Sequence, residues 1–267
     1  MRLFRCACHS GLSYLRAPAD AGSGSPAPRS GGPVDPSVLA DLAAASRILA
    51  DQGVVDAFGH VSMRHPNDPN RFLMSRSLAP ALVTPDDIME YDLDCECVYP
   101  RGRGSFLERF IHGEIFRARP DVMAVAHSHS ANVIPFGLVD KPMQAMFHNA
   151  AFIARGVPVF DINEKFGDTD MLVGNAQKGV ALAQSLGDKD IVLMRAHGSV
   201  ATGPSLPVAV FRAVYTEMNA RLQFQTMMLG GGSPIAALSP GEGVLADKVN
   251  LSSASRAWDL WKRRVGF

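Results

Sequence analysis

The sequence predicts an α/β fold in which a mixed sheet carries helices on both faces. Short apolar runs rich in β-forming residues, such as 122–126 and 191–194, alternate with longer segments whose apolar residues recur at helical spacing. That alternation is typical of helices packed on a sheet. The 267 residues are 47% hydrophobic, which is enough for a substantial core.

The charge balance and the apolar runs exclude two classes of partner. Lysine and arginine together number 26, as do aspartate and glutamate, so we expect no nucleic-acid partner. No apolar run approaches the roughly 20 residues that span a bilayer, so we expect no membrane partner. The cysteines form two close pairs, Cys6 with Cys8 and Cys95 with Cys97. This spacing argues against a disulfide framework and predicts a reducing, cytoplasmic setting with ordinary packing cysteines at 95 and 97.

Residues 1–33 are predicted to form a disordered tail or linker. Residues 1–16 contain arginines and no acidic residue, a pattern mildly typical of an organellar transit peptide, and 17–33 are rich in Ala, Gly, Ser and Pro. A plain tail, or a start codon assigned too early, is the simpler interpretation. Cys6-Ala7-Cys8-His9 could bind a metal ion, but it has no second half elsewhere in the chain.

Orderly structure is expected from residue 36. A helix over 36–51 should be capped by Asp35 or Ser37 and stopped by Gly53. The patterns then predict strands at 59–64, 72–75, 88–93 and 94–99, a helix at 106–119, a strand at 122–126, a polar loop at 161–170, a helix at 171–186, a strand at 191–194, and helices at 206–229 and 254–264.

We expect a catalytic domain over 34–240 and a helical carboxyl-terminal extension over 241–267. In the extension Trp258 and Trp261 are three residues apart, and they should pack on the chain's own core rather than close over a neighbour's pocket.

Two histidines at the end of a strand are the strongest candidate for chemistry. His127 and His129 are two residues apart, so their side chains point the same way from an extended strand. His197 follows another strand and precedes Gly198, which permits close backbone approach. Three imidazoles with an exchangeable fourth position describe a catalytic site for one divalent ion, with zinc favoured and manganese or iron possible. Glu108 could bind that ion or act as a general acid or base.

Two more histidines are weaker candidates. His112 shares one side of its helix with Glu108, so it could support the site or contact substrate. His148 could act as an acid or donate a hydrogen bond to substrate. Either could equally be structural.

Four motifs carry a family resemblance. Gly59-x-x-Ser62-x-Arg64, Glu108-x-x-x-His112, His127-x-His129 and Ala196-His197-Gly198, in this order over residues 36–240, resemble the class II aldolase/adducin family. The resemblance implies a three-layer α/β/α domain with a central, mostly antiparallel sheet, assembled as a homotetramer. It also implies that the three histidines bind a divalent ion and that the glutamate binds it or moves a proton.

The chain departs from the sugar-phosphate aldolases of that family where they bind phosphate. Two serines usual before the glutamate are Phe106 and Leu107 here, a usual Thr-Gly is Ser75-Arg76, and the asparagine usual after Gly59 is His60. Loss of these phosphate donors and gain of an arginine predict a carboxylate substrate. Arg76, with Arg64 and Ser75, would bind the carboxylate; a structural ion pair is the alternative for Arg64.

Four further segments resemble the decarboxylase branch of the family: 147–152, 156–161, 169–172 and 192–198. That branch acts on hydroxylated aromatic or ring-cleaved dicarboxylates. The resemblance implies a metal-dependent decarboxylase of a substrate like 3,4-dihydroxyphthalate, in which the ion stabilises the carbanion left by CO₂ and Glu108 or His148 protonates it. The alternatives are an aldolase or epimerase acting on a non-phosphorylated sugar or hydroxy acid, and a non-catalytic adducin-like module.

Overall fold

A seven-stranded sheet in the order β3-β2-β1-β4-β7-β6-β5 is the centre of the computed structural model, which describes residues 29–267. All neighbouring strands pair antiparallel except β5 and β6, which confirms the expected mostly antiparallel sheet. The strands are β1 (His60–Arg64), β2 (Arg71–Ser75), β3 (Ile88–Asp92), β4 (Ala124–Ser128), β5 (Val159–Phe160), β6 (Ile191–Met194) and β7 (Gly198–Gly203).

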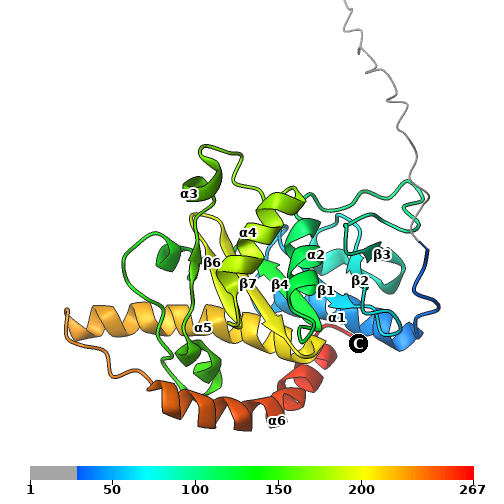
Figure 1. Cartoon of the computed structure of the whole chain (residues 1–267). Coiled ribbons are helices and arrows are strands. Elements are labelled where there is room, and N and C mark those ends of the chain that lie inside the picture. The colour runs from blue at the N-terminus through cyan, green and yellow to red at the C-terminus, as the bar shows by residue number, and fades with distance from the viewer. Residues whose placement is uncertain (1–28) are drawn as a thin grey trace, which may run out of the picture.

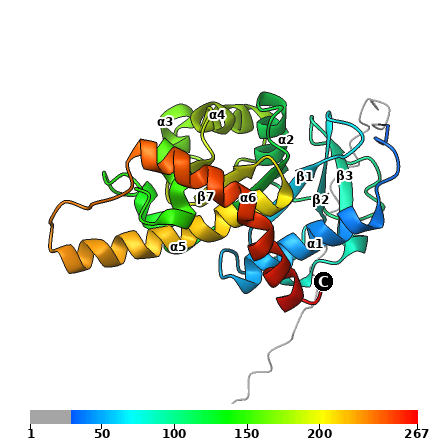
Figure 2. The same cartoon turned by 90° about the horizontal axis from the view of Figure 1, so that it is seen from below.

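Helices cover both faces of this sheet, as the sequence predicts. They are α1 (Pro36–Asp51), α2 (Arg109–Ala118), α3 (Ile162–Phe166), α4 (Ala176–Leu186), α5 (Leu206–Gly230) and α6 (Pro240–Arg264). Figure 1 shows α2 and α4 on one face, with α5 and α6 on the other. Figure 2, from below, shows α1, α5 and α6 packed against one another across that second face.

The alternation of side chains along the strands produces one core on each face. On β4, Ala124 and Ala126 pack with α1, α5 and α6, whereas Val125 packs with α2 and α4. Side chains two residues apart share a face, so His127 follows Val125 toward α2. The same rule places His60 and Ser62 of β1 on the α2 side.

A predicted strand is absent and a predicted helix begins later than expected, for local backbone reasons. Residues 94–99 form no strand, because Cys95 has a φ of 66° and turns the chain, leaving only an isolated bridge between Tyr91 and Cys97. The helix predicted from 171 begins at Ala176: Met171 also has a φ of 66°, and Asn175 caps the helix by accepting from Lys178 N–H. Cys95 and Cys97 are free thiols, and Cys95 is buried.

Several elements exceed the predictions. The polar loop contains the short helix α3, and strand β7 follows His197 directly. Helix α6 begins at Pro240, well before 254, because Ser239 and Glu242 form a capping box there. Trp258 and Trp261 are buried within the chain's own core, as predicted.

The first described residues are attached to the domain rather than free. Ser30 donates a hydrogen bond to Glu90, the N–H of Gly31 donates to the same carboxylate, and Asn67 donates to the Pro33 carbonyl oxygen. The end of the predicted 1–33 tail is therefore ordered. The predictions for residues 1–28, including the Cys6–His9 cluster, lie outside the described part of the chain. Within residues 29–267, no helix combines the length and apolar character needed to cross a membrane.

Candidate metal centre

Strand pairing brings the histidines of separate segments together at one end of the sheet. β4 pairs with β7 so that Ser128 lies opposite Ser199, which sets His197 beside the end of β4. A Cβ on Gly198 would lie 1.9 Å from the Ser128 carbonyl oxygen. Only glycine therefore lets the β6–β7 connection close against β4, as the sequence suggested. Glu108 enters from the residue immediately before α2.

The four predicted ligands converge on one point. The Nε2 atom of His129 lies 3.2 Å from Nε2 of His127 and 3.0 Å from Nε2 of His197. Oε2 of Glu108 lies 3.5 Å from His127 Nε2 and 3.4 Å from His197 Nε2. Two ligand atoms about 2.1 Å from a tetrahedral ion are about 3.4 Å apart, so this spacing fits a divalent ion. All four ligand atoms lie within 4.8 Å of one another.

The side chains are held so that their lone pairs face this point. Nδ1 of His127 donates to the Ser199 carbonyl oxygen at 3.1 Å, and Nδ1 of His197 donates to the Met171 carbonyl oxygen at 3.0 Å. A neutral imidazole with its proton on Nδ1 presents a lone pair at Nε2. Lone pairs aimed at one another repel unless a cation or a proton lies between them. The donor set therefore fits zinc, manganese or iron.

The electrostatics of the cluster favour a cation. Burial would raise the pKa of Glu108, but His127 and His197 hold this pKa far below its usual range. Burial lowers the pKa of His197, yet Glu108 more than offsets it and raises that pKa. Burial, with His127 and His197, lowers the pKa of His129 to about 4. Protons therefore compete with a cation for an anionic cluster at low pH.

A hydrogen-bonded chain lies behind the ligands. Nε2 of His112 lies 2.7 Å from Nδ1 of His60, and Nδ1 of His112 lies 2.5 Å from Oγ of Ser62. The His60 ring lies 5.0 Å, between centroids, from the ring of His127. Burial first, then the charge of His127, lowers the pKa of His112 to about 3, so His112 is neutral near pH 7. His112 thus supports the site and does not line the pocket.

The ligand cluster opens into a cavity of about 470 Å³. Its walls are mainly apolar and include the exposed side chains of Phe58 and Leu107. The lining residues are Ala57, Phe58, Gly59, His60, Ser77, Leu78, Ala79, Phe106, Leu107, Glu108, His127, His129 and Leu172. The sequence indicated His60 only as a departure from the family, and it gave no signal that Phe58 or Ser77 would line a cavity.

The three residues predicted to bind a carboxylate, Arg64, Arg76 and Ser75, do not line this cavity. Arg64 is 4% exposed and donates to the carbonyl oxygens of Pro69, Phe116, Arg119 and Val122, so it is a structural arginine. Arg76 pairs with Asp87 at 2.6 Å and does not line the cavity. Ser75 is buried and also lies outside the lining.

His148 is exposed and lies away from the ligand cluster. It begins the 3₁₀ helix His148–Arg155 and lines a different cavity, beside Tyr215 and Trp261. Within one chain, His148 is therefore not placed to protonate a substrate bound next to Glu108.

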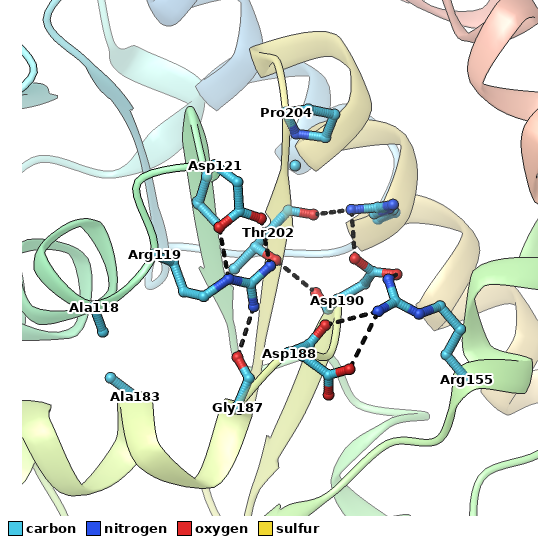
Figure 3. Close-up of a pocket in the computed structure, with 13 residues that line it drawn as sticks. Ala118, Arg119, Asp121, Arg155, Ala183, Gly187, Asp188, Asp190, Thr202 and Pro204 are labelled. Carbon is cyan, nitrogen blue, oxygen red and sulfur yellow. Dashed lines mark hydrogen bonds and ion pairs between the residues drawn. The ribbon is translucent and has the colours of Figure 1, made fainter.

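A larger cavity, of about 720 Å³, lies where β4 begins and β7 ends, whereas the ligand cluster lies where β4 ends. Figure 3 shows two of its arginines held by aspartates, Arg119 by Asp121 and Arg155 by Asp188 and Asp190. Arg212, which also lines this cavity, pairs with Asp190 at 2.9 Å. These ion pairs fasten the ends of helices and strands to one another. The cavity is a structural network and not the candidate site.

Fold and cluster together define a class: a three-layer α/β/α domain whose sheet ends in three histidines and a glutamate that could hold a metal ion. The chain belongs to the class II aldolase and adducin family, since the family model "Class II Aldolase and Adducin N-terminal domain" matches residues 40–224. This confirms the resemblance inferred from the motifs.

Curated relatives include decarboxylases. Decarboxylase tropJ of Talaromyces stipitatus is 35% identical over 239 residues, covering 82% of this chain and 90% of that protein. A 3,4-dihydroxyphthalate decarboxylase of Arthrobacter keyseri is 31% identical over 205 residues, covering 71% of this chain and 79% of that protein. These relatives confirm the prediction of a lyase from the decarboxylase branch.

The fold is also found among solved structures. L-fuculose 1-phosphate aldolase from Glaciozyma antarctica superposes with a TM-score of 0.70 at 21% identity, covering 86% of this chain and 90% of that chain. At this identity the likeness concerns the fold alone.

Proposed function

We propose that this chain is a divalent-metal-dependent decarboxylase of a hydroxylated aromatic dicarboxylate such as 3,4-dihydroxyphthalate. The observation that carries the proposal is the convergence of Glu108, His127, His129 and His197, three of which line an apolar-walled cavity. Decarboxylase names among the relatives, one of them for 3,4-dihydroxyphthalate, support the reaction and the substrate class.

The cavity walls favour a planar ring over a sugar phosphate. Phe58 is 65% exposed and its ring lies 6.3 Å from the ring of His129, so an aromatic substrate next to the cluster can contact it. Phe106 and Leu107 also line the cavity. No arginine or lysine lines this cavity in residues 29–267, so a phosphate dianion would lack a counter-charge there.

The chain's own groups supply binding and a proton. A bound divalent ion would act as a Lewis acid that stabilises the negative charge developing as CO₂ leaves. Glu108, ionised and facing the cavity, accepts the proton of the substrate hydroxyl when substrate binds. It returns that proton to the ring carbon after the carbon–carboxylate bond breaks, so charge and protons balance.

Two alternatives have less support. An aldolase or epimerase acting on a non-phosphorylated sugar or hydroxy acid would place hydroxyl groups against Phe58, Phe106 and Leu107, which offer no hydrogen bonds. A non-catalytic module would have no need for a buried glutamate beside three converging histidines.

The direct test is turnover. Purified protein restored with zinc, manganese or iron should release CO₂ from 3,4-dihydroxyphthalate and yield the monocarboxylate. A chelator or the substitution His127→Ala should abolish the reaction. No product from a panel of hydroxylated aromatic dicarboxylates, with one metal ion bound per chain, would reject the proposal. Release of pyruvate or glycolaldehyde from hydroxy acids or sugars would favour the aldolase alternative.

The homotetramer and the cytoplasmic location stay predictions. The end of α5 projects past the sheet in Figures 1 and 2, and it leaves Phe224, Met228 and Leu229 exposed. Exposed apolar side chains gathered in this way are typical of interfaces between subunits. Size-exclusion chromatography with light scattering would give the number of chains in the assembly.

A further inference from the structure

The candidate pocket has few groups that can hold a carboxylate. Arg64 and Arg76 are engaged elsewhere, and no lysine or arginine lines the cavity among the described residues. Apart from the ligand cluster, the polar side chains in the lining are His60 and Ser77. Of these two, His60 is hydrogen-bonded to His112, so the position and protonation of its ring can be worked out.

The direction of hydrogen bonding runs outward from Ser62. Ser62 is fully buried, and His112 is its only side-chain partner in the described chain. If His112 donated to it, the serine hydroxyl proton would be a buried donor without an acceptor, which is costlier than an unused lone pair. Ser62 Oγ–H therefore donates to Nδ1 of His112.

The remaining protons follow from this assignment. A neutral His112 that accepts at Nδ1 carries its proton on Nε2, and it donates this proton to Nδ1 of His60 at 2.7 Å. His60, accepting at Nδ1, then carries its own proton on Nε2. No described residue accepts a hydrogen bond from this Nε2–H, and His60 lines the cavity.

We infer that His60, oriented by Ser62 through His112, presents a fixed Nε2–H donor that binds a carboxylate oxygen of the substrate. That the acceptor is a substrate carboxylate rests on the proposed function. The position of the proton on His60 does not. It assigns to a neutral imidazole the role that the sequence suggested for Arg76. A positively charged arginine would stabilise the carboxylate and so oppose its loss as CO₂. A neutral imidazole binds the carboxylate without that full charge.

The proton position can be read without substrate. In zinc-loaded protein, long-range proton–nitrogen NMR correlations distinguish a protonated from an unprotonated ring nitrogen. We expect Nε2 of His60 to be protonated and Nδ1 to be an acceptor, with the same pattern in His112. A proton on Nδ1 of His60 would overturn the inference, whatever the enzyme's substrate.

The binding role is tested with phthalate, an aromatic dicarboxylate that lacks the hydroxyl groups. Calorimetry on zinc-loaded protein should show about tenfold or greater weakening for His60→Leu, since a hydrogen bond to a charged group is lost. His60→Gln, whose amide can donate from nearly the same place, should recover much of the affinity. Zinc content should stay at one ion per chain in both variants, and its loss in His60→Leu alone would assign His60 to the metal site instead.

The substitution Ser62→Ala tests whether Ser62 orients the rings of His112 and His60 or only fills space in the core. Ser62 does not line the cavity, so a purely structural role would lower thermal stability without changing phthalate affinity. We expect the affinity to fall as well, because the His112 and His60 tautomers are no longer fixed. Unchanged affinity would overturn the orienting role. If the tautomer is as expected but wild-type protein binds no aromatic dicarboxylate, the carboxylate acceptor and the proposed substrate class are both rejected.

Discussion

The backbone N–H of Val173 donates a hydrogen bond to Oε1 of Glu108 at 2.9 Å, in a buried position. This bond joins the segment before α4 to the residue that precedes α2, and it turns the other oxygen, Oε2, toward His127 and His197. One carboxylate oxygen is thus fixed by the fold and the other faces the site. The contact explains why Glu108 points into the cluster although it lies outside the regular helix.

Glu108→Gln should lower kcat at least a hundredfold while the fold is retained. The amide can still accept from Val173 but cannot take up and return a proton, and general acid–base catalysis contributes about 10²-fold or more. Metal affinity should also fall, because a charged ligand is lost. Steady-state kinetics and circular dichroism check this, with the exposed Glu164→Gln on α3 as the matched control. Near wild-type kcat in Glu108→Gln would remove the glutamate from the mechanism.

Zinc should raise the thermal midpoint of the chelator-treated protein. A ligand that binds only the folded chain stabilises it by mass action, by about 2.7 kcal/mol at a hundredfold excess over Kd. His197→Ala should abolish most of the shift, whereas His148→Ala, exposed and in another cavity, should keep it. An equal shift in all three proteins would place the zinc elsewhere.

The folded chain should lose stability as pH falls below about 6.5. His112 has its pKa lowered to about 3 by burial and by the charge of His127, so below 6.5 the unfolded chain binds a proton that the folded chain does not. The stability from this group is therefore present above 6.5 and is lost progressively toward pH 3. The slope is at most about 1.4 kcal/mol per pH unit for one proton.

Urea titrations of metal-free protein at pH 7 and pH 5 measure this loss. His112→Gln cannot titrate, so its stability should depend less on pH than that of the wild type, even if it is lower at pH 7. An unchanged slope in the variant would show that His112 does not carry the effect.

Gly198→Ala should damage both stability and the metal centre. The added Cβ would lie 1.9 Å from the Ser128 carbonyl oxygen, so the β6–β7 connection must move and carry His197 with it. Overpacking of this kind costs about 1–3 kcal/mol. Thermal unfolding and zinc content measure the two effects. Gly174→Ala is the matched control, because a Cβ there meets nothing within 4 Å.

Two of the four candidate metal ligands could be predicted from local geometry, whereas the other two, Glu108 and His197, were indicated by the family motifs. A two-residue spacing at the end of a strand decides that His127 and His129 share a face, whatever the rest of the fold. The support of His60 by His112 could not be predicted in the same way, since those residues are 52 apart and meet only when α2 packs on β1. The same limit applies to Arg76, whose partner Asp87 lies at the end of the connection between β2 and β3.

The strands likewise divide into those that the sequence predicts and those that it does not. Strands with β-branched or long apolar residues were found from their periodicity, and β3 and β6 lie where they were expected. Strand β7 was missed because Gly-Ser-Val-Ala-Thr-Gly contains few β-forming side chains; it is fully buried between β4 and β6, and tertiary pairing fixes it.

Substitution of the two arginines that the sequence predicted to bind substrate, Arg76 and Arg64, should have different effects on stability. Arg76→Gln breaks a half-exposed ion pair with Asp87, so stability should change by less than about 1 kcal/mol and phthalate affinity by less than twofold. Arg64→Gln leaves several buried carbonyl oxygens without donors, so it should destabilise the fold by about 2–4 kcal/mol. Urea unfolding and calorimetry on both variants decide the matter. A tenfold loss of phthalate affinity in a folded, zinc-loaded Arg76→Gln protein would return the carboxylate to the arginine and take it from His60.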